Sequence, residues 1–92
     1  MTAEAHRIGG DVAWVSSGPE RVVVLDLADP AATPTALEGS AAAIWHTIAD
    51  ADGITRDELL QVLAESFAVQ AGDIADDVDA VLRRLRELSL IS

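Results

Sequence analysis

The sequence predicts an α+β fold in which a three-stranded antiparallel sheet is followed by three helices, a winged-helix-like order of elements. The chain has 92 residues, half of them apolar, which suits one small domain with a compact core. β-Branched residues and Pro- or Gly-containing turns dominate before about Leu37, and helical periodicity dominates after it. We therefore expect a flexible N-terminus over residues 1–9 and a single domain over residues 10–92.

The first half of the chain contains three candidate strands. Residues 11–16 read as a strand with Val12 and Trp14 on one face and Ala13 and Val15 on the other. The turn residues that follow lead into a second strand over residues 21–27. The nearly continuous apolar run of the second strand indicates that much of both its faces is covered. Residues 34–37 form a short third strand, and Pro34 places it at the sheet edge because proline lacks an amide donor.

The second half contains three candidate helices. Gly39 and Ser40 open the first; Thr55 and Glu58 form a capping box for the second, which runs to about Phe67. Asp73 is the expected cap of the third helix, where Asp79 and Arg83 have the spacing of a surface ion pair. The expected buried stripes are Ala41, Ile44, Trp45 and Ile48 on the first helix; Leu59, Leu60, Leu63 and Phe67 on the second; and Ile74, Val78, Val81, Leu82, Leu85 and Leu88 on the third.

The charge balance argues against a nucleic-acid partner. Sixteen Asp and Glu residues against six Arg and no Lys give a net charge of −10 and a pI near 4.2. Such a chain repels phosphate backbones and anionic lipid headgroups, so a small winged-helix DNA-binding regulator is disfavoured despite the matching elements. Charged residues interrupt the first apolar stretch, so we expect no signal peptide, no membrane partner and a cytoplasmic location.

The side chains offer little for catalysis. The chain has no cysteine, and neither His6 nor His46 has a second ligand at metal-binding spacing. The acidic residues at the start of the third helix are ordinary for a helix N-terminus, where the helix dipole favours negative charge. We therefore expect no enzyme activity, no metal site and no cofactor.

The short third strand is the feature that suggests a function. An unpaired sheet edge is either blunted or used, and when used it receives an extended peptide by strand addition. Backbone hydrogen bonds then give affinity, and side-chain pockets give selectivity. The edge position points to Thr33, Thr35, Ala36 and Leu37 as peptide-binding residues.

The order of these elements resembles the PqqD-like proteins over nearly the whole chain. These are peptide-recognition domains (RiPP recognition elements) of ribosomal natural-product pathways, including the leader-binding proteins of lasso-peptide clusters. The resemblance rests on residues 11–14 (DVAW), 22–27 (VVVLDL), 37–45 (LEGSAAAIW), 55–59 (TRDEL), 67–69 (FAV), 77–85 (DVDAVLRRL) and 88–91 (LSLI).

The resemblance implies a non-catalytic protein that holds the leader of a precursor peptide between the third strand and the third helix. The facing wall on that helix would then include Asp77, Val81 and Arg84. The implied partners are the precursor peptide and a separate modifying enzyme: a leader peptidase, a cyclase or a radical SAM enzyme. The chain lacks the family's Gly and aromatic residues before Leu37, which predicts a smaller peptide-facing wall, and Ser89 stands where the family has Gly.

A third hypothesis stays open beside leader binding and DNA binding. The chain is then a structural subunit that forms a homodimer by pairing two sheet edges or exchanging a terminal segment. Binding of DNA falls steeply with salt, whereas strand addition changes little, so a salt titration separates the first two hypotheses.

Overall fold

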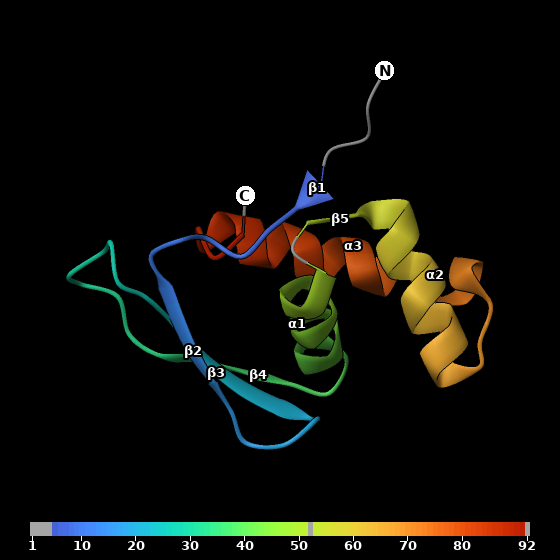
Figure 1. Ribbon diagram of the computed structural model, residues 1–92, viewed down its shortest axis with the longest axis horizontal. Coiled ribbons are helices and arrows are strands. Elements are labelled where there is room, and N and C mark those ends of the chain that lie inside the picture. The colour runs from blue at the N-terminus through green and yellow to red at the C-terminus, as the bar shows by residue number, and fades with distance from the viewer. Residues whose placement is uncertain (1–4, 52, 92) are drawn as a thin grey trace.

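The computed structural model describes residues 5–51 and 53–91. Within them, three helices lie to one side of a three-stranded antiparallel sheet (Figure 1). This arrangement confirms the predicted α+β fold. The elements in chain order are β1 (Ala5–His6), β2 (Val12–Ser16), β3 (Arg21–Asp26), β4 (Thr35–Glu38), α1 (Ser40–Ala51), β5 (Ile54–Thr55), α2 (Arg56–Phe67) and α3 (Ala71–Glu87).

The three-stranded sheet has the order β2-β3-β4. Val24 of β3 lies opposite Trp14 of β2 on one side and Thr35 of β4 on the other, and Val22 lies opposite Leu37. β4 is therefore an edge strand, as its leading proline predicted, and no strand among the described residues pairs with its other side. The hairpin of β2 and β3 is also confirmed.

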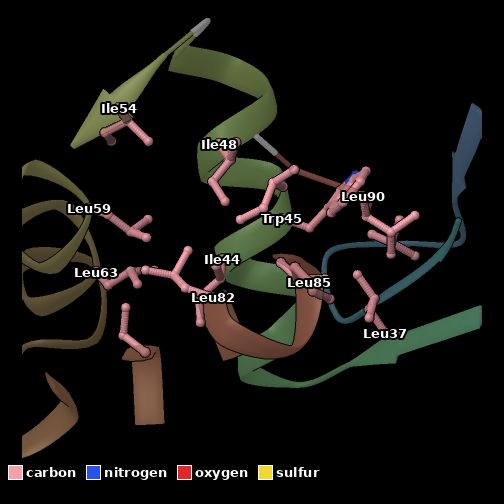
Figure 2. Close-up of a cluster of buried hydrophobic side chains, with 14 of the residues drawn as sticks. Leu37, Ile44, Trp45, Ile48, Ile54, Leu59, Leu63, Leu82, Leu85 and Leu90 are labelled. Carbon is pink, nitrogen blue, oxygen red and sulfur yellow. The ribbon is translucent and has the colours of Figure 1, made fainter. Parts of the chain in front are cut away.

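The core lies between one face of this sheet and the helices. Val22, Val24 and Leu37 are buried there, and Trp45 of α1 is fully buried with its ring edge-to-face against Trp14 (centroids 6.1 Å apart). Figure 2 shows how side chains of β4, α1, α2 and α3 converge on this core. Val23 and Leu25 face the other way and are half-buried, so β3 is fully buried on its core face and partly covered on the other.

A second, two-stranded sheet was not expected. Ala5 pairs with Thr55 and His6 with Ile54, and the Gly9 N–H donates to the Leu90 carbonyl (3.0 Å). Residues 5–9 are thus bonded to the body of the fold, and the first four residues of the segment 1–9 lie outside the described part. Strands of two residues are too short to show the alternation from which a strand is predicted.

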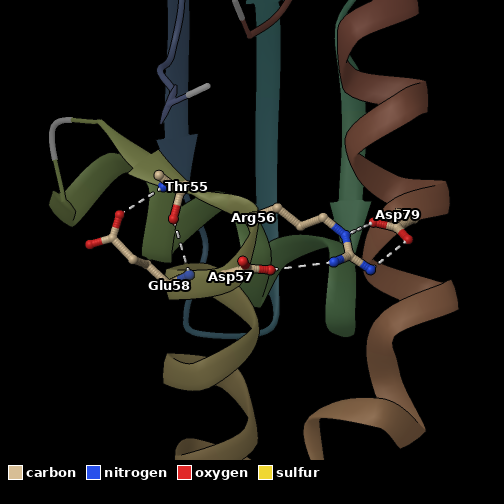
Figure 3. Close-up of polar contacts among 5 residues, drawn as sticks. All are labelled: Thr55, Arg56, Asp57, Glu58 and Asp79. Carbon is tan, nitrogen blue, oxygen red and sulfur yellow. Dashed lines mark hydrogen bonds and ion pairs between the residues drawn. The ribbon is translucent and has the colours of Figure 1, made fainter. Parts of the chain in front are cut away.

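The start of α2 follows the prediction. The Thr55 hydroxyl accepts a hydrogen bond from the Glu58 N–H (3.2 Å), and the Glu58 carboxylate accepts one from the Thr55 N–H (3.1 Å; Figure 3). The backbone N–H of Thr55 is the main reason that the pKa of Glu58 lies below its usual value. The predicted capping box is therefore confirmed.

The boundaries of α3 differ from the prediction. The helix begins at Ala71 after Gln70, which makes no side-chain capping bond. Asp73 is therefore a residue of the first turn, and the prediction that it caps the helix is wrong.

Two residues assigned to the buried stripes are exposed. Phe67 is 55% exposed and Leu88 is 38% exposed, so their assignment to the core is wrong. Phe67 is the last residue of α2, and Leu88 is the residue just after α3.

One ion pair joins α2 to α3. The Arg56 guanidinium donates two hydrogen bonds to the Asp79 carboxylate, one of them 3.0 Å long from Nη2 (Figure 3). Asp79 therefore pairs with Arg56 of the neighbouring helix. The predicted ion pair of Asp79 with Arg83 in the same helix is not formed. These hydrogen bonds lower the pKa of Asp79 and raise that of Arg56.

Candidate functional site

The open edge of β4 exposes backbone groups at alternate residues. The Gly39 N–H donates to the Glu20 carbonyl (3.0 Å), which extends the β3–β4 register by one pair. Hydrogen-bonded and non-hydrogen-bonded pairs alternate along an antiparallel ladder. Thr35 and Leu37 therefore bond to β3, whereas the N–H and C=O groups of Ala36 and Glu38 point to the open edge.

The four residues predicted at this edge differ in what they expose. Leu37 is buried in the core and Thr35 is half-buried, and both use their backbone groups to pair with β3. Ala36 is exposed, and its backbone faces the open side. Thr33 is exposed in the loop before β4. Among the four, Ala36 is thus the residue whose peptide groups a new strand would meet.

An apolar cavity lies where β4 ends and α3 begins. Its volume is about 510 Å³, and we call it the α2–α3 cavity. Gly39 and Ser40 approach it from the end of β4, while Phe67 ends α2 beside it. The other lining residues are Pro19, Glu20, Ala43, Leu63, Ile74, Asp77 and Val78.

A more polar cavity of about 370 Å³ lies at the opposite ends of the same two elements. Thr33 and Thr35 line it at the start of β4, and Leu88 and Ser89 line it just after α3; we call it the C-terminal cavity. Three carboxylates, those of Asp26, Asp29 and Glu87, also line it. The two cavities therefore lie at opposite ends of β4 and α3.

The predicted helix residues share the flank of α3 that runs between these cavities. Asp77 lines the α2–α3 cavity, and Val81 is half-buried against the core. Arg84 is exposed one turn further on and lines neither cavity. Their spacing of three to four residues places them on one side of the helix. The structure thus brings Asp77 to a cavity and leaves Arg84 at the surface.

Sequence reasoning missed the lining residues that come from α1 and α2. Phe67 follows Leu63 at the spacing of a buried stripe, and that periodicity alone assigns it to the core. Its exposure depends on where α3 packs, which the local pattern of α2 does not encode. Nothing in the sequence distinguishes Ala43 from the other alanines of α1.

Across residues 5–51 and 53–91, no three His, Asp or Glu side chains lie close enough together to hold a metal ion. No helix in these ranges is both long and apolar enough to cross a membrane.

Comparisons with known proteins point to one family and one fold. The sequence profile described as "Coenzyme PQQ synthesis protein D (PqqD)" matches residues 21–91, a range that includes β3, β4 and all three helices. The solved structure of TbiB1 in complex with the TbiA(beta) leader peptide superimposes with a TM-score of 0.78, at 20% sequence identity and over 94% of both chains. The comparison with curated proteins gives no match.

Proposed function

The chain belongs to the PqqD family, and on this premise we propose that it binds the leader segment of a ribosomally made precursor peptide. The observation that carries the proposal is the open edge of β4, which lies between two cavities. TbiB1, which has the same fold, is in complex with a leader peptide, and this supports the proposal.

The leader would add to the sheet as a fourth strand. Ala36 and Glu38 each offer one N–H and one C=O to the incoming strand, and Pro34, at the next alternate position, offers only its carbonyl. The number of donors on β4 is thus small, so backbone pairing supplies only part of the affinity. The rest would come from side chains that enter the cavities.

The α2–α3 cavity suits an apolar anchor. Its lining is mostly aliphatic, with the ring of Phe67 at one side, and burial of one large apolar side chain contributes about 1.5–3 kcal/mol. The C-terminal cavity is acidic, and it favours a cationic or hydroxyl-bearing residue of the leader. Apolar selection at one end and polar selection at the other would set the register of the peptide.

The bound leader would then be presented to a separate modifying enzyme, which is a leader peptidase, a cyclase or a radical SAM enzyme. Presentation needs no catalytic group on the carrier. A short flexible tether raises the effective concentration of the attached peptide to about the millimolar range, so the enzyme meets its substrate more often.

Calorimetry tests the binding step. The probe is the leader half of a precursor peptide encoded beside this chain, and we expect a Kd between about 1 μM and 1 nM, or 8–12 kcal/mol. Ala36→Pro removes the outward N–H and should weaken binding by at least ~1 kcal/mol, about five-fold. Ala36→Val keeps that N–H and is the matched control, with circular dichroism to check the fold.

The anchor is tested in the same experiment by Phe67→Ser. Phe67 is already 55% exposed, so its loss should disturb the fold little while it removes one wall of the α2–α3 cavity and weakens leader binding. Val62→Ser is the control, because Val62 is a 40% exposed residue of the same helix that does not line the cavity. For the Ala36 experiment, two outcomes would contradict strand addition to β4. One is a titration of the wild-type protein with leader that gives no heat, and the other is equal leader affinity of Ala36→Pro and wild type.

A further inference from the structure

A further cavity, of about 330 Å³, lies where β1, the start of α2 and α3 meet. It gathers three of the six arginines of a chain whose net charge is −10. We call it the arginine cavity, and its lining residues are His6, Arg56, Asp79, Leu82, Arg83 and Arg86. Three guanidinium groups against one carboxylate make it a positive spot on an acidic molecule.

Two of these arginines are held in place by neighbouring side chains. Nη2 of Arg56 donates to the Asp79 carboxylate (3.0 Å; Figure 3), and Nη2 of Arg86 donates to Nδ1 of His6 (3.0 Å). His6 is buried, and because a guanidinium can only donate, its Nδ1 carries no proton and its ring is neutral. Side chains that are already fixed lose little further freedom when a ligand binds, so these two contribute a prearranged wall.

The third arginine, Arg83, is the group that a ligand would meet first. Its side chain is exposed and forms no ion pair with a described residue. A guanidinium presents its N–H donors as a planar fork that matches the two oxygens of a carboxylate. Arg83 therefore offers a carboxylate-binding fork beside two guanidinium groups that are already in position.

The charges around the cavity favour one kind of anion. A nucleic acid carries one negative charge per about 1.7 Å of duplex, and the net charge of −10 repels such a polyanion. A phosphate group carries about −1.5 to −2 at pH 7, and it would lie beside the Asp79 carboxylate. A carboxylate carries a single negative charge, so Asp79 repels it less. The cavity is better matched to one or two carboxylates than to phosphate or nucleic acid.

The arginine cavity is on the other side of α3 from the residues proposed to face the leader. Successive residues of an α-helix are rotated by about 100°, so Arg83 and Arg86 share one side of α3, and Val81 and Arg84 lie on nearly the opposite side. An occupant of the cavity would therefore not compete with a bound leader. We propose that the arginine cavity binds the Asp or Glu side chains of an acidic segment in a protein partner other than the leader. This proposal goes beyond leader binding and does not rest on it.

The test is an NMR titration of the nitrogen-15-labelled protein with a blocked tetrapeptide, acetyl-Ala-Glu-Glu-Ala-amide. The neutral peptide with Gln in place of both Glu is the matched probe. We expect the Glu peptide to shift the Nε–H signal of Arg83 saturably, with a Kd of about 1 mM or below. Arg83→Gln should weaken this binding at least about ten-fold, because it removes a charged donor.

Arg84→Gln is the control for charge, because it removes the same charge from the other side of α3 and should keep the wild-type affinity for the Glu peptide. Arg83 is exposed, so Arg83→Gln should keep the wild-type fold in circular dichroism. It should also keep the wild-type Kd for the leader, since Arg83 lines neither the α2–α3 cavity nor the C-terminal cavity.

Each result decides for or against the carboxylate site. Saturable binding of the Glu peptide that Arg83→Gln weakens and Arg84→Gln does not weaken supports it. Equal binding of the Glu and Gln peptides, equal losses in the two variants, or no shift of the Arg83 signal up to about 10 mM peptide overturns it. Inorganic phosphate or a DNA duplex that binds the cavity more tightly than the Glu peptide also overturns it. Failure of the wild-type protein to bind the leader would overturn only the proposed function.

Discussion

Single residues with a left-handed backbone end two of the helices. Ala68 follows α2 with φ 55°, and Ser89 follows α3 with φ 61°, although neither is glycine. After α3, the Leu90 N–H donates to the Leu85 carbonyl (2.9 Å), the bond that closes a Schellman motif. Ser89 thus has the left-handed conformation that glycine usually adopts at this position of the motif. It also lines the C-terminal cavity.

We predict that Ala68→Gly stabilises the protein. The left-handed conformation costs a residue with a Cβ about 1 kcal/mol, and glycine removes that cost. The same change at Ala80, an exposed interior residue of α3, should destabilise by about 1 kcal/mol. Urea unfolding of both variants checks the opposite signs; a loss of stability in Ala68→Gly would show that the left-handed turn is not strained.

At the scale of elements, α2 and α3 are held together by apolar packing and by the pair of Arg56 and Asp79. Leu63 of α2 and Val78 and Leu82 of α3 are buried between them. Arg56 is the first residue of α2, so its pair with Asp79 links that end of the helix to the middle of α3. The relative placement of these two helices shapes the α2–α3 cavity, because both line it.

This pair predicts a dependence of stability on pH. The pKa of Asp79 is lowered in the folded state by the hydrogen bonds from Arg56, so the folded protein binds fewer protons at this site than the unfolded chain. The resulting stabilisation is present above the unfolded pKa of about 4 and is lost as pH falls through the folded value. Glu58 acts in the same direction through its bond from the Thr55 N–H.

Urea midpoints measured from pH 7 down to pH 3 should therefore fall more steeply for wild type than for Asp79→Asn. Asp76→Asn is the control, because Asp76 lies on the exposed side of the same helix and forms no ion pair with a described residue. If Asp79→Asn and wild type lose stability in parallel over this range, the pair with Arg56 does not stabilise the fold in solution.

At the scale of the whole molecule, a chain of net charge −10 carries a candidate site whose main proposed contacts are backbone hydrogen bonds and an apolar anchor. Phosphate contacts dominate affinity for DNA, and a chain with six Arg against sixteen Asp and Glu is poorly suited to make them. Short-range hydrogen bonds and apolar burial are little affected by ionic strength, whereas interactions between exposed charges are screened.

We accordingly predict that the leader Kd changes by less than about three-fold between 50 and 200 mM NaCl. A DNA-binding protein with several phosphate contacts loses about 10³–10⁵ in affinity over the same range. A fluorescent DNA duplex is the parallel probe and should give no saturable binding at 50 mM NaCl. Tight, strongly salt-dependent binding of the duplex would favour the regulator hypothesis over leader binding.

Much of the candidate site could be predicted from the sequence because an edge strand is a local property. Pro34 marks the edge because proline lacks the amide donor that an interior strand needs, and the chain after Glu38 continues mainly as helices. The cavities are different. Each is lined by residues from elements far apart in the chain, such as Phe67 with Gly39 or Thr33 with Ser89, and their proximity depends on how the helices cross.

The sequence by itself determined the order of the three main strands and the three helices, the capping box at Thr55 and the edge position of β4, because each follows from the pattern of a short run of residues. The tertiary structure alone decided that Arg56 bonds to Asp79, that Phe67 stands outside the core, and that one side of the sheet stays uncovered. Periodicity specifies which side of an element is apolar. Only packing specifies what, if anything, covers it.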